Sequence, residues 1–227
     1  MTMKLSSVVP FGRSFAEYVK MFALRAEDLS KSILGVGDGP ASFNAEATVG
    51  GAKVISIDPV YEFAGEQIKE RFEAVVDDII AQVKATPDDW VWRYHLSPED
   101  LRRNRLEALR EFLADFDEGK LSGRYQVQSL PQLNFQDNSF DISLCSHFLF
   151  LYSDHLDYQF HRDSVFEMLR VSKEVRIFPL LTLMLERSPY LVPLMDELHC
   201  SGYSVSIQKV AYEFQKGGDE MLKIVKY

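Results

Sequence analysis

Three glycines at alternate positions, Gly35, Gly37 and Gly39, follow an apolar segment in the first fifth of the chain. Glycine adopts left-handed backbone angles easily and has no side chain, so a ligand can lie close to the backbone of such a turn. A second apolar segment ends on an acid, Asp58, 19 residues after Gly39. In nucleotide-binding βαβ units, an acid about 20 residues beyond the glycine turn accepts hydrogen bonds from ribose hydroxyls. The spacing therefore predicts a site for a cofactor that contains a nucleoside.

The same glycines fit a dinucleotide-binding motif less well. Counted from Gly35, the GxGxxG pattern requires its third glycine at position 40, where this chain has Pro40. Proline cannot provide the close contact between helix and strand that this glycine gives. The spacing thus disfavours a cofactor such as NAD. An ordinary strand, turn and helix without any ligand remains a further interpretation.

Longer stretches around these residues resemble one enzyme family. The stretch ILGVGDGPASF at 33–43 resembles motif I of the class I S-adenosylmethionine (SAM) dependent methyltransferases, and Asp58 matches the ribose-binding acid of their motif II. The stretch LNFQDNSFDISLCS at 133–146 resembles a segment that follows the third strand in many small-molecule methyltransferases. Gly35 stands where the family commonly has an acid, and Ala41 stands at its last glycine. The stretches GDGPASFN and CSHFLFLYSD resemble an uncharacterised bacterial branch of this family.

This resemblance implies a cofactor, SAM, and a set of residues that contact it. The implied contacts are Gly35, Gly37 and Gly39 with the methionine part, Asp58 with the ribose, Ser129 and Leu130 with the adenine edge, and Cys145 near the methyl group. In many members of the family an N-terminal segment closes over the cofactor. Here Arg13 is expected to bind the SAM carboxylate through its guanidinium fork, with Tyr18 beside it.

His147 is the candidate catalytic residue, as the base or as the group that orients the acceptor. A neutral imidazole can take a proton near pH 7, and the residue lies just beyond the predicted fourth strand. A histidine hydrogen-bonded within the loop is an equally good interpretation. For the aromatic residues Phe148, Phe150 and Tyr152, core packing is favoured over an acceptor pocket. No metal is expected, because Asp154, His155 and His161 lack a recognised ligand spacing.

Composition favours one domain, 1–227, with a full hydrophobic core, since 46% of the 227 residues are hydrophobic and 26% are charged. The net charge of −9 disfavours nucleic acid and favours a small-molecule acceptor. No stretch is long and apolar enough to cross a membrane, and 1–10 lacks the apolar core of a signal peptide, so a soluble cytoplasmic protein is expected. Cys145 and Cys200 are expected to be buried thiols. The sequence leaves the oligomeric state open.

Alternating apolar segments and helical patterns predict an α/β fold, a Rossmann-like doubly wound sheet of seven strands. Strands are predicted at 32–36, 53–57, 124–128, 140–145, 174–178, 203–208 and 221–225. Helices are predicted at 14–29, from near Pro40 to just before Gly50, and at 63–84, 97–119, 156–169 and 189–202. The resemblance implies that the sheet is mostly parallel with an antiparallel last strand.

Two helical segments flank this pattern. The N-terminal segment, 1–30, holds a helix that Ser14 can cap. The segment 86–121 is an insertion, whose helix has Ser97 as its cap, and it is a candidate lid or acceptor-shaping element. Its arginines can be interpreted as an anion-binding face, although a solvated helix face is favoured because acids outnumber bases there. These arginines are Arg102, Arg103, Arg105 and Arg110.

The leading functional hypothesis is a SAM-dependent methyltransferase that acts on a small or medium acceptor. A SAM-binding regulatory module without catalysis is the main alternative, because Gly35 and Ala41 depart from the family pattern. An oxidoreductase that uses NAD(P) is a third hypothesis.

Overall fold

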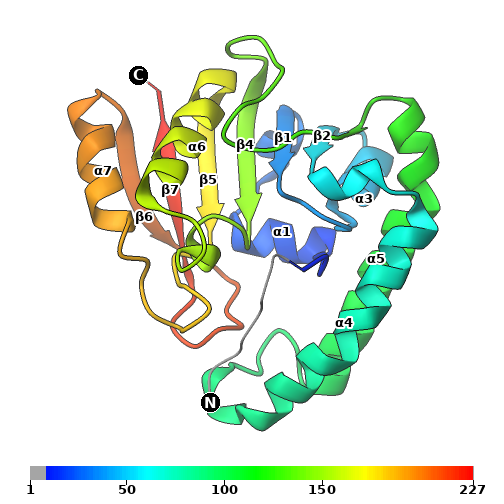
Figure 1. Cartoon of the computed structure of the whole chain (residues 1–227). Coiled ribbons are helices and arrows are strands. Elements are labelled where there is room, and N and C mark those ends of the chain that lie inside the picture. The colour runs from blue at the N-terminus through cyan, green and yellow to red at the C-terminus, as the bar shows by residue number, and fades with distance from the viewer. Residues whose placement is uncertain (1–8, 227) are drawn as a thin grey trace.

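The computed structural model describes residues 9–226, which contain a seven-stranded sheet in the order β3-β2-β1-β4-β5-β7-β6 (Figure 1). The strands are β1 (Ser32–Val36), β2 (Lys53–Ile57), β3 (Tyr125–Gln126), β4 (Phe140–Ser146), β5 (Ser172–Phe178), β6 (Ser204–Lys209) and β7 (Glu220–Val225). The pairs from β3 to β5 are parallel, and β7 is antiparallel to both of its neighbours. The predicted doubly wound sheet with an antiparallel last strand is confirmed.

The described residues also form seven α-helices, of which the first two precede β1 and the other five lie between strands. They are α1 (Phe15–Met21), α2 (Ala26–Leu29), α3 (Phe43–Val49), α4 (Gly65–Ala85), α5 (Pro98–Leu121), α6 (Tyr158–Val171) and α7 (Leu191–Cys200). Ser97 caps α5 as predicted, because its Oγ accepts the backbone N–H of Asp100 at 3.1 Å. Ser14 caps α1 in the same way, through the N–H of Glu17.

Three predicted boundaries were wrong. The N-terminal helix is broken, because Ala23 has a φ of 48° between α1 and α2. Helix α3 begins at Phe43 and not near Pro40, since the turn continues while the N–H of Ser42 donates to the carbonyl of Arg13. Strand β3 has only two residues, because it pairs with β2 at Tyr125 and Gln126 alone.

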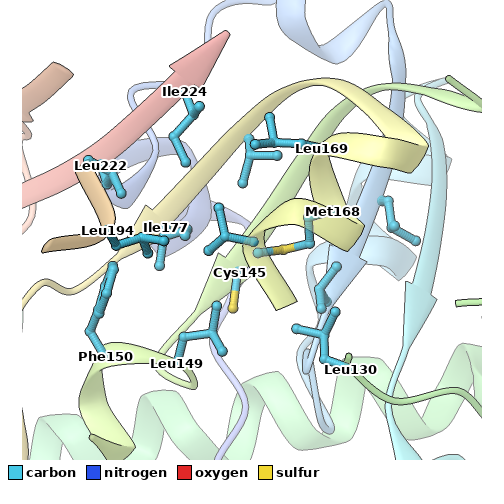
Figure 2. Close-up of a cluster of buried hydrophobic side chains, with 14 of the residues drawn as sticks. Leu130, Cys145, Leu149, Phe150, Met168, Leu169, Ile177, Leu194, Leu222 and Ile224 are labelled. Carbon is cyan, nitrogen blue, oxygen red and sulfur yellow. The ribbon is translucent and has the colours of Figure 1, made fainter. Parts of the chain in front are cut away.

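Both faces of the sheet are covered. Neighbouring residues of β1 point to opposite faces, so Ile33 belongs to a buried cluster that includes residues of α1 and α3, while Leu34 belongs to one that includes residues of α6 and α7. Figure 2 shows the second cluster, in which the side chain of Cys145 lies among apolar side chains such as Leu149 and Met168. The cysteine prediction was right for Cys145 and wrong for Cys200, which is exposed at the end of α7.

Helices α4 and α5 form a long hairpin that extends beyond the carboxyl ends of the strands (Figure 1). The two helices have a core of their own, to which the aromatic rings of Tyr61, Phe72 and Phe112 belong. Helix α5 also contacts α3, so the hairpin is attached to one face of the sheet. In the part of the chain from 9 to 226, no helix is long and apolar enough to cross a membrane.

Candidate functional site

The register of the sheet brings three strand ends to one point. Val36 at the end of β1 pairs with Ile57 of β2 on one side and with Cys145 of β4 on the other. The chain leaves β1 and β4 toward opposite edges of the sheet, which opens a crevice at this topological switch point. A cavity of about 580 Å³ lies there. It is lined by eight of the predicted site residues, namely Arg13, Tyr18, Gly37, Gly39, Asp58, Ser129, Leu130 and His147.

The glycine turn lines this cavity through Gly37 and Gly39. Gly37 and Gly39 have φ angles of 65° and 54°, a left-handed conformation that side-chain-bearing residues rarely adopt. A Cβ on Gly37 would lie 3.3 Å from the ring of Phe148, and a Cβ on Gly39 would lie 3.9 Å from Oδ2 of Asp58. Absence of both side chains therefore leaves backbone exposed to the cavity.

Asp58 follows β2 and is fixed by the backbone. Its Oδ2 accepts the N–H of Gly39 at 2.9 Å, and its Oδ1 accepts the N–H of Val60 at 2.8 Å. Each carboxylate oxygen keeps a second lone pair, so the group can accept two further hydrogen bonds. Burial raises the pKa of Asp58, while the two backbone N–H groups lower it.

A second acid, Asp38, lies between two of the glycines and was missed in the sequence. Its Oδ1 accepts the hydroxyl of Tyr18 at 2.7 Å, and its Oδ2 accepts that of Ser56 at 2.6 Å. Asp38 is among the residues that line the cavity, although it is only 6% exposed. Burial raises the pKa of Asp38 to about 7, against the effect of the two hydroxyls, and the charge of Asp58 raises it further.

The segment 9–13 covers one side of the cavity and carries Arg13. Phe11 stacks on Phe72 of α4, with ring centroids 5.7 Å apart. Gly12 packs on the glycine turn so closely that a Cβ there would lie 2.1 Å from the carbonyl oxygen of Pro40. Arg13 donates one hydrogen bond to the carbonyl of Phe11, and its Nε is buried with no hydrogen-bond partner in the described chain. Burial and the charge of Arg105 lower the pKa of Arg13 to about 10.

Arg105 of α5 corrects the prediction of a solvated arginine face. It is 1% exposed and binds both carboxylate oxygens of Glu17 at 2.6 Å, while Arg102, Arg103 and Arg110 pair with acids nearer the surface. Although burial alone would raise it, the pKa of Glu17 is well below its ordinary value because of Arg105 and His95. Arg105 also donates to the carbonyl of Gly12 at 3.3 Å. The buried pair therefore supports the segment that carries Arg13.

His147 lies just after β4 with a φ of 50°, an uncommon angle for a side-chain-bearing residue. Its backbone N–H donates to the carbonyl of Phe178 at 2.7 Å, and the Nδ1 atom of its ring lies 2.9 Å from Oγ of Ser146. Burial and the positive charges of Arg13 and Arg105 lower the pKa of His147 well below its ordinary value. The ring is therefore neutral at pH 7 and lines the cavity.

Two predicted contact residues lie elsewhere. Cys145 is fully buried in the cluster of Figure 2, where burial raises the pKa of its thiol to about 12. Gly35 lies beneath the side chain of Asp38 and does not line the cavity. Of the aromatic set, Phe148 lines the cavity, whereas Phe150 and Tyr152 are buried. Within residues 9–226, no three His, Cys, Asp or Glu side chains are placed to hold a metal ion.

The N-terminus of α3 is the place where a dinucleotide fold binds its pyrophosphate. Here Gly12 and Arg13 cover it, and the N–H of Ser42 is bonded to the carbonyl of Arg13 at 3.1 Å. The first turn of α3 also contains an acid, Glu46, whose carboxylate accepts the hydroxyl of Ser42. This arrangement leaves no open helix terminus for a pyrophosphate.

Comparison with solved structures identifies the fold. The structure of the mitomycin 7-O-methyltransferase MmcR is similar with a TM-score of 0.50 and 11% identity, over 94% of this chain and 54% of that one. This chain thus spans about half of that enzyme. A magnesium protoporphyrin IX methyltransferase (ChlM) from Synechocystis PCC 6803, solved with bound SAM, matches at a TM-score of 0.46 and 15% identity, over 87% of this chain and 71% of that one. The strand order and the similarity to MmcR show a methyltransferase fold.

No protein-family model matches the chain. One curated relative, the uncharacterized protein MJ0045 of Methanocaldococcus jannaschii, is 35% identical over 223 residues, which are 98% of both chains. This relative is archaeal, so the expected bacterial branch stays a prediction. The identity extends over nearly the whole length of both proteins, and the chain therefore belongs to the same family as this archaeal protein.

Proposed function

We propose that this chain is a SAM-dependent methyltransferase that transfers a methyl group to a small or medium acceptor by in-line displacement. The observation that carries the proposal is the carboxylate of Asp58, held by two backbone N–H groups beside a bare glycine turn. Its free lone pairs fit the two hydroxyls of a ribose. The cavity volume of about 580 Å³ is within the usual range for cofactor sites, roughly 300 to 1,000 Å³.

Bound SAM supplies an electrophilic methyl group on a positively charged sulfur. In-line displacement would form the bond from the acceptor atom to the methyl carbon as the carbon–sulfur bond breaks, would release S-adenosylhomocysteine, and would pass the proton of a hydroxyl or amine acceptor to a base or to water. The chain contributes mainly alignment, because near-attack geometry is worth roughly 7 to 11 kcal/mol. A general base adds a factor of about 10² to 10⁴.

His147 is the group we place beside the acceptor. Since its pKa lies well below the ordinary value, the imidazole is neutral at pH 7 and can accept a hydrogen bond from an acceptor hydroxyl or amine. Phe148 and the apolar side chains of Val9, Phe11 and Val75 line the same cavity and can exclude water from the reaction.

The first test is calorimetry of the full chain with SAM and with S-adenosylhomocysteine, followed by a label-transfer screen over small acceptors. Binding of both ligands and transfer to an acceptor are expected. Binding without any transfer would favour the regulatory module, and tight NAD binding without SAM binding would favour the oxidoreductase. The organisation as one domain, 1–227, and the cytoplasmic location remain part of the proposal.

A further inference from the structure

Two of the residues that line the cavity, Asp38 and Arg13, have ionisable side chains without an ion-pair partner in the described part of the chain. Among residues 9–226, Asp38 accepts hydrogen bonds from two hydroxyls, those of Tyr18 and Ser56, and takes part in no ion pair. In this same range, the one hydrogen bond that the Arg13 side chain donates goes to the carbonyl of Phe11, and its buried Nε has no partner. Charges removed from water are normally paired, because desolvation of a lone charge is costly. The missing partners therefore point to a ligand that supplies both charges.

A carboxylate and a guanidinium in one cavity complement a zwitterion. The ligand must carry a cation that fits Asp38 and an anion that fits the fork of Arg13. An α-amino acid group has both charges on neighbouring atoms. SAM carries this group at its methionine end, whereas a nucleoside or dinucleotide does not.

We propose that Asp38 binds the α-ammonium group of the cofactor while Arg13 binds its α-carboxylate. The inference rests on the proposed function and names the residue that recognises the amino-acid end. The sequence pattern offered no candidate for the ammonium, because Gly35 stands where the family commonly has its acid. In this chain the acid is supplied three residues later.

The environment of Gly35 accounts for this exchange of positions. A Cβ built on Gly35 would lie 1.8 Å from Oδ2 of Asp38, 2.5 Å from its Cγ and 2.8 Å from its Oδ1. The carboxylate of Asp38 thus occupies the space that a side chain at position 35 would fill. A glycine at 35 leaves room for the carboxylate of Asp38, whereas any side chain at 35 would require that carboxylate to move.

Neighbouring side chains hold the carboxylate in this place. The hydroxyl of Tyr18 comes from α1, and that of Ser56 comes from β2. Ser56 is itself fixed by Asn44 of α3, whose Nδ2 donates to its Oγ at 3.1 Å. Each carboxylate oxygen retains a lone pair for an ammonium N–H. The acid is therefore preorganised for a cation on the cavity side.

The test compares two ligands that share the nucleoside and differ in the amino-acid group, S-adenosylhomocysteine and 5′-methylthioadenosine. Calorimetry on the full chain measures both ligands with the wild type, Asp38→Asn and Asp58→Asn. We expect Asp38→Asn to weaken S-adenosylhomocysteine by about 10- to 100-fold, the usual effect of losing a hydrogen bond to a charged group. The affinity for 5′-methylthioadenosine should change by less than about threefold, because that ligand has no ammonium.

Asp58→Asn is the matched control, because both ligands carry the ribose and both should weaken together. Retained binding of 5′-methylthioadenosine also shows that Asp38→Asn is folded. An equal loss for both ligands in Asp38→Asn, or unchanged binding of S-adenosylhomocysteine, would overturn the assignment of Asp38 and leave the methyltransferase proposal standing. A wild type that binds neither ligand would overturn both.

Discussion

Replacing Asp38 by asparagine is expected to stabilise the ligand-free protein, and the gain should increase with pH. Burial raises the pKa of Asp38 from 3.8 to about 7. The folded chain therefore binds a proton at this residue between those values, whereas the unfolded chain releases it. By linkage, the stability that depends on Asp38 is greatest at low pH, falls from pH 4 to 7 and is constant above. Asparagine does not titrate, so the stability of Asp38→Asn does not contain this pH-dependent decrease.

The size of the effect follows from the pKa change. One pKa unit corresponds to about 1.4 kcal/mol, so the ionised carboxylate costs the fold about 4 kcal/mol above pH 7. Part of this cost is already present at pH 5, where the unfolded chain is ionised. Between pH 5 and pH 8 the unfolding free energy of Asp38→Asn should therefore rise by about 2 to 3 kcal/mol relative to the wild type.

Urea unfolding of both proteins at pH 5, 6, 7 and 8 measures this difference. Asp141→Asn is the control, because Lys173 and Ser32 lower the pKa of Asp141 to about 2 and both chain states are ionised throughout this range. Its difference from the wild type should not vary with pH. A constant difference for Asp38→Asn as well would refute the assignment of an unpaired buried acid. A stability cost of this kind is typical of functional sites, where a charge awaits its ligand.

Three other substitutions test the site. Gly35→Ala should displace the carboxylate of Asp38. In calorimetry it should therefore weaken binding of S-adenosylhomocysteine selectively, as Asp38→Asn does, whereas an equal loss of affinity for 5′-methylthioadenosine would contradict the packing described above. Glu17→Gln should destabilise the fold by about 3 to 5 kcal/mol in urea unfolding, because Arg105 is left buried without a charged partner; a change near zero would show that water reaches the pair. His147→Ala should lower the transfer rate by about 10²-fold with unchanged SAM affinity, and a loss of only a few-fold would rule out the base role.

Local patterns in the sequence predicted the strands next to the site well. The predicted and observed bounds of β1 and β2 are the same, because each strand is a short segment built around three apolar residues and is followed directly by a turn residue, Gly37 or Asp58. The resulting register then places the predicted glycines and acid around one crevice. Periodicity and turn chemistry act over a few residues, so they suffice for these features.

The charged groups of the site depend on partners far away in the chain, and local patterns do not reveal them. Arg105 looked like one of several arginines on an exposed helix, but its partner Glu17 lies 88 residues earlier. Asp38 looked like a spacer between glycines, while the two hydroxyls that fix it belong to Tyr18, 20 residues earlier, and to Ser56, 18 residues later. Burial of a charge is decided by tertiary packing. An acid between two turn glycines was the one local signal for Asp38.

The insertion helix α5 supports both charged groups without lining the cavity. In the N-terminal half of α5, Arg105 donates to the carbonyl of Gly12, which precedes Arg13. In the C-terminal half of α5, Asp115 binds the guanidinium of Arg124, which donates to Oδ1 of Asn44 at 2.8 Å. Asn44 donates to Ser56, and Ser56 donates to Asp38. The helix predicted as a lid or acceptor-shaping element is thus linked by hydrogen bonds to the segment of Arg13 through Arg105 and to Asp38 through Asp115, and these links account for the buried polar contacts of the insertion.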